Sequence, residues 1–489
     1  MNTDTKPLRV YREEDWFSLD TEPTVLLPAI RPEPTSKTPG PRHAAPVNWS
    51  RIRHRITVVT LVIGVTCALY IGQHMLWPHE QLPSTDPGWV WAWLGILWAV
   101  AVIPAACEMS GLLMWRPPLA QPRPIRNLVC WRIVSRGLNV EALRETITAC
   151  RREMQRTPLF PYVIEVVIDT GTSTDGLPVP GADLRYLRVP KQYSTVNGTR
   201  NKARALNYAL WASPIPDDAW IVHLDEESRP LRSGITGIAA AIHEEEASGK
   251  LRIGQGTITY HRDWANHPFF TLADCIRTGS DLGRLYLSMK VGVPLFGLHG
   301  SFIVVRNDVE RALGFDVGPK GSLTEDAWWG TIAMDQGYRC RWVEGHVAEQ
   351  CTFSVRDFLK QRRRWFSGMA CTALRAPVSW KWRALLGISM VTWASAPIAW
   401  IYTIAHFVAG GYCPPEIRAM ANISLAVYIT TTIIGLGVNM EEHGIRHPLL
   451  KLRWLATWIA CLPVFSFMEA TAVAYALVSP AKTFDVVRK

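Results

Sequence analysis

The sequence lacks the features that mark secreted or disulfide-bonded proteins. Its ten cysteines are scattered singly, with no C-x-x-C pair and no spacing typical of a metal site. This favours reduced, mostly buried thiols that face the cytosol or the lipid. Residues 1–50 contain no apolar run, so they lack the core of a signal peptide. They are rich in Pro, Thr and charge, and we expect a disordered cytosolic tail there.

A nucleic-acid-binding motif is also missing, although the chain is basic. Lys and Arg number 52 against 42 Asp and Glu, which gives a formal net charge of +10. A basic surplus suits nucleic acid, an anionic membrane face or a phosphate-bearing substrate. Because the sequence has no nucleic-acid-binding module, an anionic membrane face or a phosphate-bearing substrate is the favoured partner.

Long apolar runs are present and lie near both ends of the 489-residue chain. Each approaches or exceeds the roughly 20 residues that a helix needs to cross a bilayer. The five candidate spans are residues 56–77, 89–107 running on toward 115, 384–409, 419–438 and 455–478. Trp77, Trp89, Trp382 and Trp454 stand at their edges, as interfacial anchors do. The alternative is buried helices of a soluble protein.

Flanking charges orient these spans. Arg51, Arg53 and Arg55 precede the first, whereas the link 78–88 has no Lys or Arg. Basic residues favour the cytosol, so we expect the amino terminus and the middle domain to be cytosolic in a multi-pass protein of the cell membrane. Five full crossings would place the basic tail 482–489 outside, and a re-entrant or interfacial segment is the alternative. The expected division is a tail (1–50), two transmembrane helices (51–115), a middle domain (116–376), and about three transmembrane helices with a short basic tail (377–489).

The middle domain alternates short apolar strands with helical patterns. The expected strands are residues 128–134, 162–168, 184–189, 220–224 and 252–260, and the expected helices include 140–155 and 199–211. This alternation predicts an α/β domain with a mostly parallel sheet. Ligands of such sheets bind beyond the carboxyl ends of the strands.

An acidic cluster follows one of these strands directly. The sequence WIVHLDEE places Asp225 at the strand end and Glu227 two residues later. Two carboxylates, completed by phosphate oxygens and water, suit Mg²⁺ or Mn²⁺. A solvated loop is the alternative interpretation.

Other polar residues gather at the same expected sheet edge. Asp169 ends a second strand and can accept hydrogen bonds from a base or a ribose, and Arg136 follows the first strand. Lys202 and Arg204 open a helix after a glycine-bearing loop and can neutralise a pyrophosphate. Each of these residues alone is more typical of a surface charge or a helix cap.

Two later motifs complete the candidate set. Glu325 and Asp326 open a helical pattern that also carries Trp329, which suits a general base beside a sugar-stacking platform. Acidic residues in a first turn can instead serve only the helix dipole. Arg364 and Trp365 belong to a basic, aromatic helix that suits either a diphosphate leaving group or an anionic lipid surface.

Taken in order, these motifs resemble the membrane-bound family 2 glycosyltransferases. That family has a nucleotide-binding Asp, a metal-binding acidic pair, a Glu-Asp base and a Gln-x-x-Arg-Trp motif. The matching residues are Asp169, Asp225 with Glu227, Glu325 with Asp326, and Gln361 with Arg364 and Trp365. Within the family the similarity is closest to egghead-type β-1,4-mannosyltransferases and covers most of residues 127–370, including His299-Gly-Ser-Phe302.

The resemblance implies a Rossmann-like GT-A fold and an inverting, metal-dependent hexosyltransferase. Mannose would pass from GDP-mannose in β-linkage to a membrane-associated lipid or glycan acceptor, with Mg²⁺ or Mn²⁺ as cofactor. The implied roles are catalysis for Asp326 and Glu325; donor binding for Arg136, Asp169, Lys202, Arg204, Asp225, Gln361, Arg364 and Trp365; acceptor binding for Trp365, Trp329 and His299; and metal binding for Asp225 and Glu227.

Two other functions stay open at this point. One is a processive β-glycan synthase that uses UDP-glucose or a related donor, because Gln-x-x-Arg-Trp occurs in such synthases too. The other is a non-catalytic membrane scaffold that retains the domain.

Overall fold

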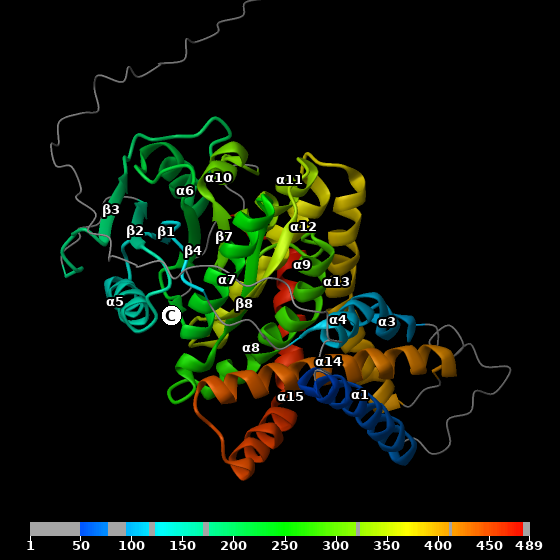
Figure 1. Ribbon diagram of the computed structural model, residues 1–489. Coiled ribbons are helices and arrows are strands. Elements are labelled where there is room, and N and C mark those ends of the chain that lie inside the picture. Colours follow the sequence, from blue (N-terminus) through cyan, green and yellow to red (C-terminus); the bar gives the residue numbers. More distant parts are fainter. Residues whose placement is uncertain are drawn as a thin grey trace, which may run out of the picture.

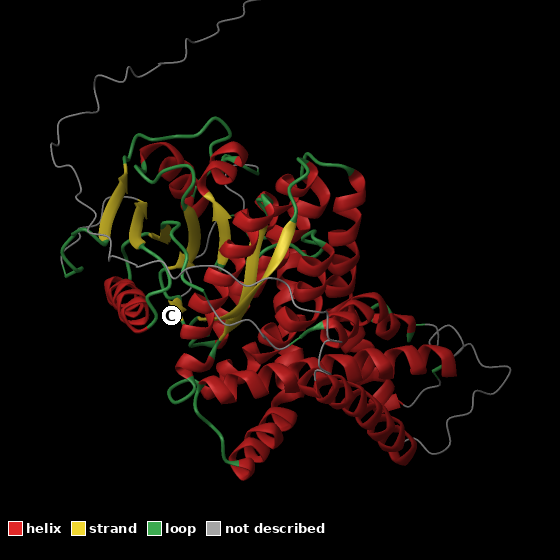
Figure 2. Ribbon diagram, in the orientation of Figure 1, coloured by secondary structure: helices red, strands yellow, loops and turns green. Residues whose placement is uncertain are grey.

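The computed structural model describes residues 49–76, 94–116, 123–169, 176–318, 323–409 and 413–482. The tail expected at 1–50 lies almost wholly outside the described residues, as do the link 78–88 and most of the tail 482–489. The described chain forms an α/β domain packed against a group of long apolar helices (Figure 1, Figure 2).

An eight-stranded sheet in the order β3-β2-β1-β4-β7-β6-β8-β5 forms the centre of the α/β domain. One half is parallel and contains β1 (Val129–Ser135), β2 (Tyr162–Asp169), β3 (Leu184–Val189) and β4 (Trp220–Asp225). The other half contains β5 (Arg229–Pro230), β6 (Ile253–Thr259), β7 (Ile303–Arg306) and β8 (Cys340–Ala348). β7 runs antiparallel to β4 and β6, and β5 antiparallel to β8, whereas β6 and β8 are parallel. The predicted mostly parallel sheet is confirmed.

Helices cover both faces of the sheet. Alternate side chains of a strand point to opposite faces, so one strand contributes to two apolar cores. In β4, Val222 and Leu224 join a core with helices α5 (Val140–Arg156) and α7 (Arg232–Ser248). Ile221, which directly precedes Val222 and points to the other face, joins a second core with α6 (Asn201–Ala212), α10 (Asn307–Leu313) and α11 (Glu325–Asp335). Between β6 and β7 the chain forms η2 (His261–Asp263), α8 (Pro268–Ser280), the π-helical turn η3 (Asp281–Leu285) and α9 (Tyr286–Val291).

Five helical stretches are long and apolar enough to cross a membrane. They are α1 (Trp49–Leu76), α3 (Ile96–Ala99) continued by α4 (Val102–Met114), α13 (Trp380–Ala409), α14 (Pro415–Glu442) and α15 (Pro448–Val478). Large apolar side chains remain exposed on them, such as Ile63 at 58% and Ile401 at 66%. Such surfaces favour contact with lipid.

Several contacts join the apolar helices to the α/β domain, and two of them are extensive. Helix α14 crosses α8 where glycines meet, and a Cβ on Gly435 would lie 2.1 Å from the Cys275 carbonyl oxygen and 2.6 Å from the Gly279 nitrogen. Helix α12 (Val355–Arg375) packs against α13 and α15, where Phe366 shares an apolar cluster with Met390 and Val473. The apolar helices are therefore held directly against the edge of the sheet that carries the polar motifs.

Candidate active site

One cavity of about 1510 Å³ joins the carboxyl edge of the sheet to the apolar helices. Its wall includes Asp169 and Asp225 from strand ends, and Trp393 and Glu469 from α13 and α15. Drug-sized ligands typically occupy pockets of about 300–1,000 Å³. The cavity therefore has room for more than one substrate.

The strand ends bring the expected polar residues to the rim of this cavity. Asp225 ends β4 opposite Val134 of β1, and Asp169 ends β2. Parallel strands end at the same edge of a sheet, so both carboxylates and the Arg136 that follows β1 line the cavity. Next to Asp225, the carboxylate of Glu226 points back to the sheet and accepts a hydrogen bond of 2.5 Å from the Ser135 hydroxyl.

Lys202 lies at the centre of the acidic residues. Its ammonium donates hydrogen bonds to Asp225 Oδ1 and, at 2.7 Å, to the Gly300 carbonyl oxygen, and it lies 3.8 Å from Glu325 Oε1. Burial lowers the pKa of Lys202, but Asp225 and Glu325 more than offset this and raise it overall. Lys202 is therefore a fixed positive charge in the site.

Asp225 and Asp326 come together although about a hundred residues separate them. A Cβ on Gly300 would lie 3.7 Å from Asp225 Oδ2 and 3.4 Å from Asp326 Oδ2. Both carboxylates line the same cavity. The structure therefore brings the end of β4 and the start of α11 together beside Gly300. Because Gly300 has no side chain, the space between the two carboxylates stays open.

The acidic pair at the start of α11 is buried, which changes its protonation. Burial and the neighbouring Glu325 raise the pKa of Asp326 to about 7, while Lys202 opposes the rise. The pKa of Glu325 is also raised, mainly by burial. A carboxyl group that titrates near pH 7 is suited to accept a proton from a hydroxyl at neutral pH.

Two residues near Lys202 and Gly300 adopt backbone conformations that non-glycine residues rarely use. Asn201 has a φ of 53° and Phe302 a φ of 60°. Asn201 directly precedes Lys202, and Phe302 follows Gly300 by two positions. Strained backbone of this kind concentrates at functional sites.

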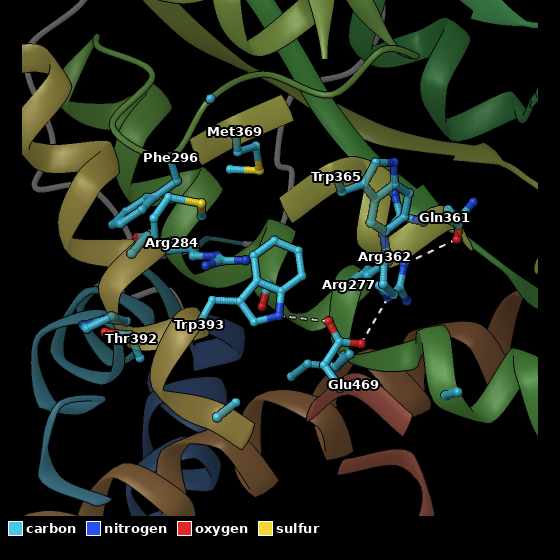
Figure 3. A pocket seen from close by; sticks show the side chains of 18 of the residues that line it. Arg277, Arg284, Phe296, Gln361, Arg362, Trp365, Met369, Thr392, Trp393 and Glu469 are labelled. Atoms are coloured by element: carbon cyan, nitrogen blue, oxygen red, sulfur yellow. Dashed lines mark hydrogen bonds and ion pairs between the residues drawn. The ribbon is translucent and has the colours of Figure 1, made fainter. Parts of the chain in front are cut away.

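Helix α12 carries the Gln-x-x-Arg-Trp motif, and its residues Gln361, Arg364 and Trp365 all line the cavity. Two guanidinium groups lie beside the Trp365 ring, that of Arg277 at 4.2 Å and that of Arg362 at 4.3 Å from its centre (Figure 3). Burial lowers the pKa of Arg364, and the carboxylates of the acidic centre oppose that change. Arg364 therefore lies close enough to the acidic centre to interact with it.

Arg204 differs from its predicted position, because its guanidinium is bound to other protein groups. It donates hydrogen bonds to Asp169 Oδ1, to the Pro190 carbonyl oxygen at 2.6 Å and to the Tyr193 carbonyl oxygen at 3.0 Å. Burial raises the pKa of Asp169, and Arg204 opposes this rise. Arg204 thus fixes Asp169 and the loop 190–193 rather than pointing a free cation at a pyrophosphate.

The two remaining residues predicted to bind the acceptor, Trp329 and His299, lie in different surroundings. Trp329 is only 1% exposed and stacks on Phe315 at 5.3 Å inside the core, so the expectation of a sugar-stacking platform there is wrong. His299 lines the cavity, with Nε2 3.3 Å from Asp281 Oδ1. Burial, assisted by Arg277 and Arg284, lowers the pKa of His299 to about 3, so its imidazole is neutral at pH 7.

Some cavity residues were missed by the sequence reasoning. Glu469 lies within the apolar run 455–478, and an ionisable residue in such a run is by itself a sign of function. Arg277 and Trp393 also face the cavity, but neither stands in a motif. Only the packing of α8, α12 and α13 brings them there.

Asp225 and Glu227 fit a divalent metal that is shared with a substrate. Both line the cavity, and the Asp225 side chain is 33% exposed and already attracts the Lys202 ammonium. Across the described ranges, no group of three or more His, Cys, Asp or Glu side chains is placed to hold a metal alone. Mg²⁺ is commonly held by one or two carboxylates plus substrate phosphates. The donor set therefore suits a metal that binds together with a diphosphate.

Comparison with known proteins gives one matching family. The model of Glycosyl transferase family group 2 matches residues 220–468. Beta-1,4-mannosyltransferase bre-3 of Caenorhabditis briggsae is 29% identical over 462 residues, which cover 90% of this chain and 98% of that protein. Beta-1,4-mannosyltransferase egh of Drosophila melanogaster is 31% identical over 372 residues, which cover 74% of this chain and 78% of that protein.

Among solved structures, one likeness is to mannosyltransferase PcManGT from Pyrobaculum calidifontis, in complex with GDP-Man and Mn²⁺. It has a TM-score of 0.43 and 17% sequence identity, and it covers 78% of this chain and 98% of that one.

Proposed function

The chain belongs to Glycosyl transferase family group 2 and is a glycosyltransferase, and we propose that it transfers mannose from GDP-mannose, with inversion, onto a membrane-associated glycolipid. Relatives named β-1,4-mannosyltransferases align with up to 90% of the chain, which supports mannose and a β-linked product. The GT-A fold inferred from the motifs agrees with the mostly parallel sheet and the family. The observation that carries the proposal is the convergence of Asp225, Lys202 and Asp326 on one cavity.

In this proposal the sheet edge holds the donor. Asp169, fixed by Arg204, and Arg136 bind the nucleoside, while Lys202 and Arg364 balance the negative charge of the diphosphate. Asp225 and Glu227 would hold Mg²⁺ or Mn²⁺, which supplies positive charge to the departing nucleoside diphosphate. These roles follow from position and charge.

Asp326 acts as the general base. Its carboxylate takes the proton of an acceptor hydroxyl, and the oxygen then forms a bond to the anomeric carbon of mannose. The bond from that carbon to the diphosphate oxygen breaks at the opposite side, so an α-linked donor gives a β-linked product and GDP leaves with the bonding electrons. The raised pKa of Asp326 suits this role at neutral pH.

The location follows from the apolar helices, which indicate a membrane protein. We place the α/β domain in the cytosol, because basic residues before α1 favour that side. A lipid acceptor can then reach the cavity from the bilayer, since α13, α14 and α15 contribute to its wall.

A donor panel tests the proposal. The purified full-length protein, in detergent with Mn²⁺ or Mg²⁺, is given GDP-mannose or UDP-glucose with and without glucosylceramide, and release of nucleoside diphosphate is measured. We expect GDP release that depends on the lipid, and mass spectrometry showing one added hexose. Release of UDP with a ladder of products would support the processive β-glycan synthase instead, and no turnover despite tight nucleotide binding would support a scaffold.

Replacing Asp326 by Asn tests the base separately. The variant keeps the size of the side chain but cannot take the proton, and positioned proton transfer is typically worth about 10²–10⁴-fold in rate. We expect kcat to fall by about that factor, while the affinity for GDP-mannose and the thermal unfolding temperature stay near those of the wild type. Full activity in this variant would remove Asp326 from the role.

A further inference from the structure

The part of the cavity between the apolar helices carries polar groups where lipid-facing helices normally have none. Glu469 lies in the second half of α15, a stretch long and apolar enough to span a membrane, yet its side chain is 32% exposed and lines the cavity. Ionisable residues in such helices are costly and mark binding or transport sites. The proposed donor site at the sheet edge does not account for this group.

Glu469 is held in place by two neighbours, one for each carboxylate oxygen. Trp393 Nε1 donates a hydrogen bond of 3.0 Å to Oε1, and Arg362 Nε donates one of 3.0 Å to Oε2 (Figure 3). A carboxylate offers about four acceptor positions in all. Glu469 can therefore accept further hydrogen bonds from a ligand without giving up either neighbour.

Arg362 connects this pair to the reaction centre. Its guanidinium lies 4.3 Å from the Trp365 ring, and it is also bound by Asp274 of α8. Trp365 belongs to the motif that lines the donor part of the same cavity. A molecule held by Glu469 therefore lies in the space that opens on Asp326 and not in a separate pocket.

The surroundings of Glu469 define the chemistry of the ligand. The half-buried Trp393 indole and the carboxylate together offer an apolar ring face and hydrogen-bond acceptors, which suit the ring and hydroxyls of a sugar. Glu469 and Asp274 both pair with the guanidinium of Arg362, so the group that this cluster adds to the cavity wall at Glu469 is a carboxylate, which repels a phosphate. Leu425, Val427 and Leu462 extend the wall with apolar surface for a hydrocarbon chain.

We propose that Glu469 and Trp393 form the binding site for the sugar head of a neutral glycolipid acceptor, with its hydrocarbon chain between α13, α14 and α15. The carboxylate accepts hydrogen bonds from sugar hydroxyls that do not react, and the indole packs on the sugar ring. This inference rests on the proposed function and names the residues that select its acceptor.

The test uses full-length protein in nanodiscs with GDP-mannose and dodecyl β-glucoside, together with the set of its monodeoxy derivatives. Replacing Glu469 by Gln should raise the acceptor KM about 10- to 100-fold, the loss expected for hydrogen bonds to a charged group. The KM for GDP-mannose should stay unchanged. With the wild type, one deoxy derivative should show a similar increase in acceptor KM over dodecyl β-glucoside. With the Glu469→Gln variant, that derivative and dodecyl β-glucoside should have nearly the same KM.

Two further variants and one further acceptor complete the design. Glu441→Gln is the matched control, because Glu441 is 69% exposed, pairs with Lys451 and does not line the cavity. Trp393→Phe removes the indole N–H and should raise the acceptor KM with an unchanged donor KM. Dodecyl phosphate presents the same chain with a charged head and should be a poor acceptor.

The outcomes separate this inference from the proposed function. If Glu469 only supports Arg362 and Trp365, Glu469→Gln keeps the wild-type pattern across the deoxy derivatives, and the inference is overturned. It is also overturned if the wild type prefers dodecyl phosphate, or if Glu469→Gln loses GDP-mannose affinity together with acceptor affinity. A wild type that releases no GDP with any acceptor would instead contradict the proposed function.

Discussion

The absence of a side chain at Gly300 gives a direct test of the reaction centre. A Cβ there would lie 2.9 Å from Lys202 Nζ, so the ammonium must shift from its present position among the carboxylates. Misplacing reacting groups by about 1 Å can cost about 10²-fold in rate. We expect Gly300→Ala to keep the fold and to lower kcat/KM by about 10- to 100-fold.

The control for this variant is Gly181→Ala, because a Cβ at Gly181 would meet no atom closer than 3.9 Å. Both variants are compared in thermal unfolding and in GDP release. Wild-type activity in Gly300→Ala would show that the position of Lys202 does not matter for transfer.

The raised pKa of Asp326 predicts how activity depends on pH. Below about pH 7 the carboxyl group binds a proton and can no longer accept one, so kcat/KM should fall as the pH drops through this value. The observed value will belong to the Glu325–Asp326 pair, since the two groups interact. Lys202 lowers the Asp326 pKa, so in Lys202→Met the fall should begin at a higher pH. A kcat/KM that does not change across neutrality would contradict the assignment.

At the level of single residues, the sequence was most informative where the local context fixes the position. Asp169 and Asp225 could be placed because each ends an apolar strand, and strand ends in a parallel sheet meet at one edge. The surroundings of Arg204 and Trp329 could not be predicted. Both sit on helices, and their side chains meet residues of the preceding loop or of the segment before the helix, whose packing no local pattern of the sequence shows.

Among the elements, the crossing of α8 and α14 depends on small residues. A methyl group on Gly435 would overlap the Cys275 carbonyl oxygen at 2.1 Å, so the two helices would have to separate. Overpacking of this kind typically costs about 1–3 kcal/mol. Gly435→Ala should therefore lower the thermal unfolding temperature and weaken the contact between the membrane helices and the α/β domain.

Gly437 provides a matched control in the same helix, because nothing lies within 4 Å of a Cβ built there. Gly437→Ala should leave stability unchanged or raise it slightly, since Ala favours helix more than Gly does. Unfolding in detergent, followed by circular dichroism, distinguishes the two. Equal stability of both variants would show that the close crossing is not needed.

The elements show which patterns carry structural information. Long apolar strands such as β1 and β2 were predicted to within one residue, because they are buried on both faces. The short β7 was not predicted, and its antiparallel direction depends on where the chain returns after α9. Helices α1 and α15 begin before their apolar runs, because polar residues can form the first turns of a helix ahead of its lipid-facing part.

At the scale of the whole molecule, both ends of α15 lie beside the helices of the α/β domain. Near its start, Trp454 packs on Trp264 at 5.2 Å, and just beyond its end the Ala481 nitrogen donates a hydrogen bond of 3.0 Å to the Ser367 hydroxyl of α12. Pro463 lies inside this continuous helix, between the two contacts. Because both ends of this continuous helix lie against the α/β domain, we propose that α15 lies in the membrane interface, which would leave the basic tail on the side of that domain.

The opposite side of the membrane can be identified from α1. Near its start, His54 Nε2 lies 2.9 Å from the Leu112 carbonyl oxygen at the end of α4, close to the α/β domain. Near its other end, Gln73 exchanges hydrogen bonds of 2.9 Å with Asn422 of α14. Since α1 has 28 residues and a helix rises about 1.5 Å per residue, these two contacts are about a membrane thickness apart.

Cysteine labelling tests this arrangement. Single cysteines replace the exposed residues Ser248 in α7, Lys482 after α15 and Glu416 at the start of α14, in a variant whose exposed Cys67 is changed to Ser. A membrane-impermeant maleimide should label positions 248 and 482 from one side of sealed vesicles and position 416 from the other. Labelling of positions 482 and 416 from the same side would instead require α15 to cross the membrane fully. The basic residues Lys482, Arg488 and Lys489 would then lie on the side opposite to the α/β domain, against the usual preference of basic residues for the cytosol.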